Sequence, residues 1–255
     1  MNKTKKTNKK CDLWLIVDFD DVINKTTLSD KQMHKEFSTK YNIPEGKINE
    51  MYEESKIINK FGKKVFRPDV LIKKIKNNYP SAVNLEKILR KYEKNNFIDQ
   101  AVRRALISVK KTQPNKNIKI SILTFGDIKF QKRRIENSKI LKVVDDVIYT
   151  ESSKKEAVER LSKKYSVKNM PFVITVDDHP RHVDDLAKLK LKKYLNIRFS
   201  HPQGKHSKEN HKSKNIIICK NALDIFRISV LAINENAEKN NKKYQKFAKF
   251  IKQAK

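Results

Sequence analysis

The chain has 255 residues, with 59 lysines and arginines against 29 aspartates and glutamates, and a formal net charge of +30. Hydrophobic residues make up 38% of the chain, which is enough for one domain or a domain with a subdomain. No apolar run approaches a membrane span, and the basic N-terminus leads into no cleavable apolar segment, so we expect neither a transmembrane helix nor a signal peptide. The only cysteines, Cys11 and Cys219, are far apart, which favours a reduced, cytoplasmic protein.

The excess of positive charge has two interpretations. It is typical of proteins that bind a polyanion such as nucleic acid, but it also follows from a composition rich in lysine and asparagine. The lysines are spread over every segment, and arginine, which suits bidentate contacts with phosphates and bases, is much rarer. We therefore favour the compositional interpretation and keep nucleic acid as an alternative partner.

The first part of the chain is predicted to be a basic tail, one buried strand and a run of helices. Residues 1–10 are expected to be disordered, and the branched apolar run 13–17 is expected to form a strand. Ser29 or Asp30 can cap the next helix, and Pro44 suits the first position of the one after it. The predicted helices cover residues 30–41, 44–57, 68–77, 85–94 and 98–110.

The rest of the chain alternates strands and helices. We predict strands at residues 118–123, 147–149, 172–176, 196–199 and 216–218, and helices at 128–138, 153–165 and 222–251. This alternation predicts an α/β fold with a Rossmann-like parallel sheet. The last helix becomes very basic, and its stripe of Tyr244, Phe247 and Phe250 either packs on the domain or contacts an anionic surface.

Acidic side chains follow the first predicted strand. The apolar run ends in Asp18, Asp20 and Asp21, and the alternation of strand side chains places Asp18 and Asp20 on the same side. Burying carboxylates next to a core strand is costly unless a cation or hydrogen bonds compensate them. Two converging carboxylates favour a Mg²⁺ site with an attached nucleophile, and a solvated acidic turn is the alternative.

Two later strands also end in polar residues. Thr124 and Phe125 end one of them, and Asp177 and Asp178 end another. Ligands of open parallel sheets bind at the carboxyl ends of the strands, so we expect these residues to gather near Asp18.

The order of these motifs resembles the haloacid dehalogenase (HAD) superfamily. Asp18-Phe19-Asp20-Asp21-Val22 is similar to its first motif, Leu123-Thr124-Phe125-Gly126 to its second, and Val176-Asp177-Asp178-His179-Pro180 to its fourth. The resemblance covers about residues 13–220 and implies a Rossmann-like core. The helical stretch between the first and second motifs would be a C1 cap, which closes over the site and selects the substrate.

The resemblance also implies a division of the chain into regions. Residues 11–22 and 106–220 would form the core, residues 23–105 the helical cap, and residues 221–255 a basic helical extension. The cap contains no recognisable substrate loop. Arg67 is a candidate substrate contact there, although a solvated arginine fits as well.

The resemblance implies roles for four of the acids. Asp18 would attack phosphorus to form an aspartyl phosphate and would bind Mg²⁺ through its carboxylate. Asp20 would bind Mg²⁺ through its backbone carbonyl and serve as general acid and base. Asp178 matches the usual third metal ligand. Asp177, where the family often has glycine, could support the metal site or belong to an ordinary acidic turn.

The phosphoryl group would be bound by a threonine and a lysine. Thr124, with the backbone N–H of Phe125, matches the family's second motif, and a strand-end threonine that caps the next turn is the alternative. The segment Ser153–Glu156 fits a capping box, which places Lys154 and Lys155 in a first helical turn that favours anions. Lys154 has the family's spacing to later apolar positions, so we prefer Lys154 to Lys155, and an ordinary surface lysine is the alternative.

These observations predict a Mg²⁺-dependent phosphohydrolase that acts on a soluble phosphomonoester, such as a sugar phosphate, phosphoglycolate or a nucleotide. A phosphomutase is a variant of this prediction. The alternatives are a nucleic-acid end phosphatase and a non-catalytic binding protein, although a mere scaffold has no use for clustered, mutually repelling acids. His201, His206 and His211 match no common zinc pattern and are expected in a polar loop.

Overall fold

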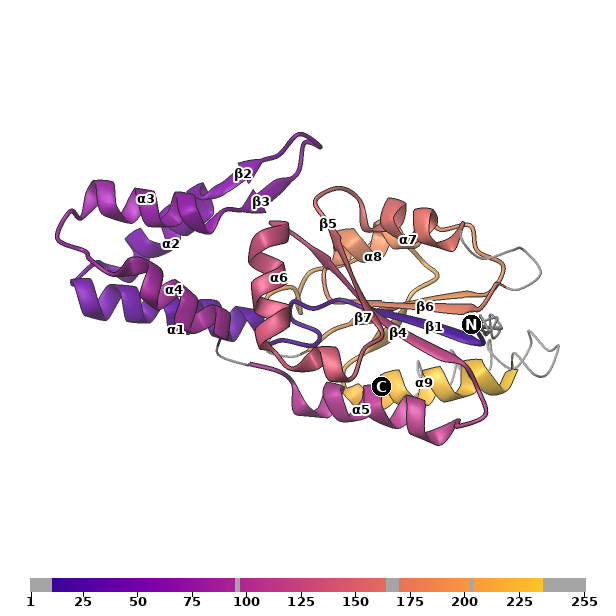
Figure 1. Ribbon diagram of the computed structural model, residues 1–255. Helices are drawn as coiled ribbons and strands as arrows, with labels where there is room; N and C mark the ends of the chain where they lie inside the picture. The colour runs from indigo at the N-terminus through magenta and orange to yellow at the C-terminus, as the bar shows by residue number, and fades with distance from the viewer. Residues whose placement is uncertain (1–10, 95–96, 164–169, 202–203, 236–255) are drawn as a thin grey trace, which may run out of the picture.

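The computed structural model describes residues 11–94, 97–163, 170–201 and 204–235 (Figure 1). The predicted basic tail and the C-terminal aromatic stripe lie outside these residues. A six-stranded sheet has the order β5-β4-β1-β6-β7-β8, and all its neighbouring strands are parallel. The strands are β1 (Leu13–Val17), β4 (Ile118–Phe125), β5 (Asp146–Thr150), β6 (Phe172–Asp177), β7 (Tyr194–Phe199) and β8 (Ile217–Cys219). The predicted α/β fold class is therefore confirmed.

Helices cover both faces of this sheet. On one face lie α5 (Gln100–Thr112), α6 (Ile128–Asn137), the short 3-10 helix η1 (Ile140–Lys142) and α9 (Ala222–Glu235). On the other face lie α7 (Lys154–Ser162) and α8 (Pro180–Leu186). The central strand β1 separates the two cores, because Leu13, Leu15 and Val17 face the first layer and Trp14 and Ile16 face the second.

The segment between β1 and α5 forms a separate cap, at the left of Figure 1. It contains α1 (Thr26–Tyr41), α2 (Glu45–Glu54), β2 (Lys56–Ile58), β3 (Lys64–Phe66), α3 (Pro68–Asn78) and α4 (Leu85–Lys94). Its helices enclose a hydrophobic core of their own, in which Phe37, Ile48, Leu71, Ile75 and Leu85 are fully buried. This core explains why the insert can keep a fixed shape although little of it packs on the sheet.

The cap contains an antiparallel hairpin that the sequence prediction missed. The helix expected to reach residue 57 ends at Glu54, and β2 pairs with β3. The turn between the strands is built around Asn59, whose side chain accepts hydrogen bonds from the backbone N–H groups of Phe61 and Lys63. Gly62 takes a φ of 69°, which a glycine adopts without strain. The hairpin could therefore have been recognised in the sequence from its turn residues, Asn59 and Gly62.

Two predicted boundaries are wrong in the structure. The cap boundary at residue 105 falls inside α5, which packs on the sheet along its whole apolar face of Val102, Leu106 and Val109. The predicted C-terminal extension begins with α9, and its buried Ile225 and Ile228 belong to the same core, so this helix is part of the α/β unit. No helix among the described residues is both long and apolar enough to cross a bilayer.

Candidate functional site

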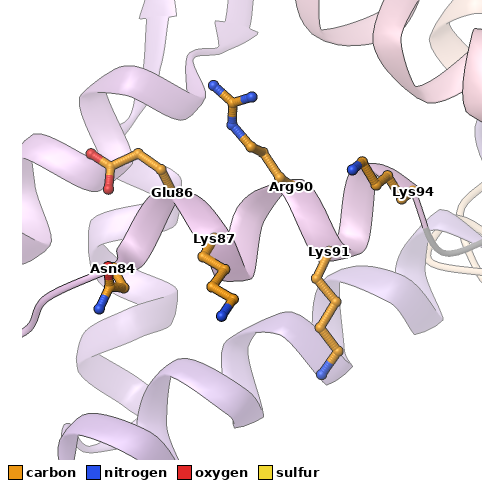
Figure 2. Close-up of a pocket in the computed structure, with 6 residues that line it drawn as sticks. All are labelled: Asn84, Glu86, Lys87, Arg90, Lys91 and Lys94. Atoms are coloured by element: carbon orange, nitrogen blue, oxygen red, sulfur yellow. The ribbon is translucent and has the colours of Figure 1, made fainter.

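The described surface has several hollows, and two of them lie in contrasting places. One, of about 450 Å³, lies on α4 and is lined by Asn84 and by charged side chains of that helix (Figure 2). These side chains point in different directions in Figure 2, and Lys91 is already paired with Glu36 at 2.6 Å. The second hollow, of about 290 Å³, lies at the carboxyl ends of the strands and contains Asp20. The strand ends are therefore the candidate site.

The sheet register brings the predicted motifs together. Val17 pairs with Val176, so Asp18 and Asp177, which follow them, lie side by side at the end of the central strands. The backbone N–H of Asp18 donates to the carbonyl of Val176 at 2.8 Å. Because parallel strands end at one edge of a sheet, residues far apart in the chain meet here.

Lys154 lies between these two carboxylates. Its ammonium group is 2.7 Å from Asp18 Oδ2 and 2.6 Å from Asp177 Oδ2, and the lysine side chain is only 1% exposed. Ser153 caps α7 by accepting a hydrogen bond from the N–H of Glu156, as predicted, and so points Lys154 at the strand ends. Lys155 instead pairs with Glu159 on the surface of α7. The geometry therefore favours Lys154 over Lys155.

The strand ends carry more buried negative charge than Lys154 neutralises. Asp18, Asp177 and Asp178 are all buried. Burial raises the pKa of Asp18 well above its ordinary value, Asp177 and Asp20 add to the rise, and Lys154 opposes it. Burial, Asp177 and Asp18 likewise raise the pKa of Asp178. For Asp177, by contrast, Lys154 and His182 outweigh the effect of burial, and its pKa is lowered. Such a surplus is the environment expected around a divalent cation.

Metal-ligand atoms also converge at this place. One atom each of Asp18, Asp177 and His182 lies within 4.8 Å of the others. The Nδ1 atom of His182 is buried without a hydrogen bond and is 3.7 Å from Asp177 Oδ1. Asp178 does not belong to this group, so in this geometry Asp177 is the acid beside Asp18. The assignment of Asp178 as a metal ligand remains a prediction.

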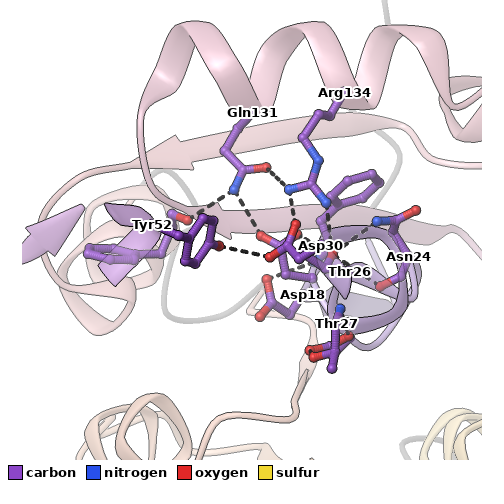
Figure 3. A network of polar contacts seen from close by, with 12 residues as sticks. Asp18, Asn24, Thr26, Thr27, Asp30, Tyr52, Gln131 and Arg134 are labelled. Carbon is purple, nitrogen blue, oxygen red and sulfur yellow. Dashed lines mark hydrogen bonds and ion pairs between the residues drawn. The ribbon is translucent and has the colours of Figure 1, made fainter. Parts of the chain in front are cut away.

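Asp20 has different hydrogen-bond partners from Asp18, and these partners, Arg134, Gln131 and Thr26, are labelled in Figure 3. Its carboxylate accepts hydrogen bonds from Arg134 at 2.7 Å, Gln131 at 2.8 Å and Thr26 at 2.6 Å. Strand β1 ends at Val17, so the alternation that predicted a common side for the two acids does not extend to Asp20. Burial alone would raise the pKa of Asp20, but Arg134 and the hydrogen bonds lower it.

The sequence analysis did not identify Arg134 or Gln131. They lie three residues apart on one face of α6, where nothing in the local sequence distinguishes Arg134 from its neighbour Arg133. The structure separates the two, because Arg133 pairs with Glu93 of the cap at 2.7 Å while Arg134 is 8% exposed and faces Asp20.

The two residues of the second motif have different surroundings. Thr124 is fully buried, and its hydroxyl has no hydrogen-bond partner among the described residues. An orphaned buried hydroxyl is costly, so it suits a ligand oxygen that the protein alone does not supply. Phe125 lies at the wall of the cavity, with its ring 5.4 Å from that of His182. The role expected of its backbone N–H remains a prediction.

The cap closes one side of the 290 Å³ cavity. The hairpin reaches the core through Asn59, whose side-chain amide donates to the carbonyl of Glu151 at 2.7 Å. Arg67, which the sequence offered as a substrate contact, instead pairs with Asp127 at 3.1 Å. These two contacts join the cap to the segments that follow β4 and β5.

The histidines after β7 do not form a metal group in the part of the chain that the structure describes. The ring of His206 lies 4.0 Å from that of His179, and both line the cavity. Burial, with His182 and His206, lowers the pKa of His179 to about 3, so this ring is neutral. His211 lies apart from them, beside Arg198.

The sequence matches no protein-family model and no curated protein. Solved structures do match. A haloacid dehalogenase-like hydrolase from Burkholderia xenovorans has 14% identity and a TM-score of 0.65, over 88% of this chain and 99% of that one. A HAD-hydrolase from Bacillus subtilis, solved with bound magnesium, has 13% identity and a TM-score of 0.56, over 86% and 99%. A β-phosphoglucomutase from Thermotoga maritima has 14% identity and a TM-score of 0.54, over 84% and 97%.

Dehalogenases are also among the matches, for example the L-2-haloacid dehalogenase of Xanthobacter autotrophicus, with 10% identity and a TM-score of 0.55 over 84% and 97%. At these identities the likeness concerns the fold and does not distinguish between the reactions of these proteins. The parallel sheet with helices on both faces agrees with that likeness. The chain therefore has the fold of the haloacid dehalogenase-like hydrolases that it matches.

Proposed function

We propose that this protein is a divalent-metal-dependent phosphohydrolase that cleaves a small soluble phosphomonoester through an aspartyl phosphate on Asp18. The observation that carries the proposal is the buried group of Asp18, Lys154 and Asp177, with a second carboxylate, Asp20, two residues after the first. One carboxylate can serve as nucleophile and the other can exchange protons.

Asp18 is held in place for nucleophilic attack. Its Oδ1 accepts a hydrogen bond from the backbone N–H of Phe19 at 2.7 Å, and its Oδ2 contacts Lys154. In the proposed first step a carboxylate oxygen of Asp18 forms a bond to phosphorus while the bond to the leaving oxygen breaks. The ammonium group of Lys154 reduces the repulsion between the carboxylate and the phosphoryl oxygens, and the Thr124 hydroxyl can donate to one of those oxygens.

Asp20 favours an ester over a halide as the leaving group. A leaving alkoxide needs a proton, whereas a halide ion leaves without one, so a second acid has a use only in the first reaction. Arg134 keeps Asp20 ionised, which suits it to accept a proton from the water that hydrolyses the aspartyl phosphate. For Asp20 to carry the proton that the leaving oxygen takes up, its contact with Arg134 has to loosen.

The residues at the strand ends fit a divalent cation. Asp18, Asp177 and Asp178 are buried, and Lys154 is the one ammonium group paired with them in the part of the chain that the structure describes, so these acids outnumber that counter-ion. Mg²⁺, when bound, would supply the charge neutralisation that lets a carboxylate approach a phosphate dianion. The Asp18 carboxylate, the Asp20 backbone carbonyl and Asp177 or Asp178 are the groups that would hold it.

The shape of the site favours a small molecule over a nucleic-acid end. Its volume of about 290 Å³ is at the lower end of the range of ~300–1,000 Å³ that is common for small-ligand pockets. Asp127, which pairs with Arg67 of the cap, lines the cavity, where a continuing strand would need an open path.

The proposal is tested by phosphate release from a panel of phosphomonoesters, with and without Mg²⁺. The panel includes 5′-phosphorylated oligonucleotides, and chloride release from 2-chloropropionate is measured in parallel. We expect release from small esters that requires Mg²⁺ and is lost in Asp18→Asn but kept in Asp69→Asn, a control on the exposed surface of the cap. Chloride release, or phosphate release that survives in Asp18→Asn, would overturn the proposal.

A further inference from the structure

The cavity beside Asp20 has a second wall, formed by the cap hairpin and the loop after β7. Three lysines line it: Lys56 in β2, Lys64 in β3 and Lys205 in the loop. None of them belongs to the strand-end group that holds Asp18. The chemistry proposed above uses none of these cations, so their presence in the cavity needs a separate explanation.

These lysines have one acid among them. Glu53 is in contact with Lys56, lies 4.0 Å from Lys205, and has its pKa lowered by Lys56, Lys205 and Lys64 against the effect of burial. Three cations therefore surround one carboxylate, which leaves a surplus of positive charge. Lys56 is only 20% exposed, so part of this surplus is removed from bulk water, which weakens the repulsion between like charges.

The acids that line the cavity offset this surplus only in part, because two of them are paired with arginines and the third, Asp30, attracts Lys56. Asp20 is paired with Arg134, and Asp127 is paired with Arg67. Asp30 accepts a hydrogen bond from the hydroxyl of Tyr52 at 2.8 Å, on the side of the cavity towards Arg134. The hairpin side of the cavity is thus cationic, while the acid expected to act on the substrate is at its other side.

Aromatic rings form the floor between the two sides. The rings of Tyr52 and Phe66 are 4.6 Å apart, and those of Phe66 and Phe130 are 5.4 Å apart. The ammonium group of Lys56 lies 4.8 Å from the centre of the Tyr52 ring, which holds the lysine against the floor. A ligand in this cavity would meet aromatic rings as well as the cations of the hairpin and of the loop after β7.

We propose that this cavity selects phosphomonoesters that carry a second anionic group, a phosphate or a carboxylate, which Lys56, Lys64 and Lys205 bind while the scissile phosphate lies at Asp18. The inference rests on the proposed function for the identity of the scissile group. It adds the property that distinguishes the preferred substrates from phosphomonoesters in general.

The test compares substrates that differ only in the second anion. Glycerol 3-phosphate is paired with 3-phosphoglycerate, and fructose 6-phosphate with fructose 1,6-bisphosphate. The variant is Lys56→Met with Lys64→Met. Its control is Lys60→Met with Lys63→Met, which removes the same charge from exposed positions of the same hairpin that do not line the cavity. The kcat/KM of each protein is measured with all four compounds in Mg²⁺.

We expect the natural protein to prefer the more anionic member of at least one pair by about ten-fold or more, the size of effect typical of a charge-assisted contact. The cavity variant should lose this preference while keeping its kcat/KM for the less anionic member, and the control should keep both. A preference for the bisphosphate identifies a second phosphate as the bound group, and a preference for 3-phosphoglycerate identifies a carboxylate. Ratios near one in the natural protein, or an unchanged ratio in the cavity variant, would overturn the inference.

A binding measurement separates this inference from the proposed function. Calorimetric titration of 3-phosphoglycerate and fructose 1,6-bisphosphate is done on Asp18→Asn, with and without the two cavity substitutions. Binding of either compound that is about ten-fold weaker with the cavity substitutions supports the inference even if no ester is hydrolysed, in which case only the proposed function fails. Equal binding, or no binding of either compound, contradicts the inference.

Discussion

The two sides of the site differ in charge and in burial. Asp18, Asp177 and Lys154, at the strand ends, have side chains that are 1–6% exposed and carry surplus negative charge. Lys56 and Lys205, on the cap side, are 20% and 55% exposed and belong to a surplus of positive charge. Buried charges on rigid strands keep the fixed geometry that a reaction needs, whereas partly solvated charges on a hairpin and a loop can adapt to a ligand.

Arg134 and Asp20 connect the two sides. Arg134 lies on α6 of the core, and its second guanidinium nitrogen donates to Thr26, the first residue of the first cap helix, at 2.8 Å. Asp20 accepts from both residues. A change in the position of the cap therefore affects Asp20, the carboxylate expected to exchange protons. Substitutions on either side of the site should for this reason have measurable effects on activity.

The largest effect is expected from Lys154→Met, which removes the only ammonium group in contact with Asp18 and Asp177 among the described residues. We expect kcat to fall about 10²–10³-fold and the free energy of unfolding to fall by about 3 kcal/mol, because buried carboxylates lose their counter-ion. Steady-state kinetics and urea denaturation measure the two effects. Lys155→Met is the control, since its partner Glu159 is on the surface, and equal effects of the two substitutions would contradict the assignment of Lys154.

Arg134→Gln should have the next largest effect. It leaves Asp20 without its cation, so the pKa of Asp20 should rise and the acidic limb of the kcat/KM profile should move to higher pH. We expect a loss of about 2 kcal/mol in the free energy of unfolding at neutral pH. The control is Arg133→Gln, which removes an arginine that pairs with Glu93 of the cap and should leave the pH profile unchanged.

The ion pair between Asp20 and Arg134 also determines how the free energy of unfolding depends on pH. The pKa of Asp20 is lower in the folded protein than its ordinary value, so its ionised form stabilises the fold above about pH 4. This contribution is lost as the pH falls through the folded-state pKa. The difference in stability between the natural protein and Arg134→Gln should therefore be largest at neutral pH. It should shrink as the pH falls through the raised pKa of Asp20 in the variant towards its lowered pKa in the natural protein. A difference that grows on acidification would contradict this account.

Asp178→Asn should have a smaller effect of opposite sign. Burial and neighbouring acids raise the pKa of Asp178, so its ionisation opposes folding at neutral pH. Without divalent cations, we expect the asparagine variant to be about 1 kcal/mol more stable, a rise in Tm of about 2–4 °C. The gain should disappear below about pH 4, where the carboxyl is protonated in both states, and it should diminish when Mg²⁺ is added. Calorimetric melting curves with EDTA or Mg²⁺ measure both changes.

The smallest effect is expected from Asn59→Asp in the hairpin. The aspartate keeps the acceptor that organises the turn and loses the amide donor to Glu151, the contact that joins the hairpin to the core. A lost hydrogen bond of about 1 kcal/mol should raise KM a few-fold and leave kcat nearly unchanged. Asn78→Asp, whose amide donates to Lys74 within the cap, is the matched control. A fall in kcat without a change in KM would show that the hairpin acts on the chemistry and not on binding.

Short-range patterns were sufficient to predict the core of this fold. Apolar runs bounded by polar residues located β1, β4 and β6, and the residues that end them include Asp18, Thr124 and Asp177. The capping box at Ser153 likewise predicted where α7 begins and that Lys154 lies in its first turn. The alternation of side chains along a strand and the capping of a helix depend on residues that are close in the sequence. The carboxyl ends of parallel strands lie at one edge of the sheet, so locating the strands was enough to bring these residues together.

The partners of Asp20 and the charge of the cavity required the tertiary structure. Gln131 and Arg134 are separated from Asp20 by 111 and 114 residues, and nothing in the composition of α6 distinguishes them from its other polar residues. The lysines of the hairpin and of the loop after β7 meet because the cap folds back onto the sheet, in a chain where lysine is common everywhere. Local periodicity sets which face of an element is buried, but only packing between distant elements decides which charges become neighbours.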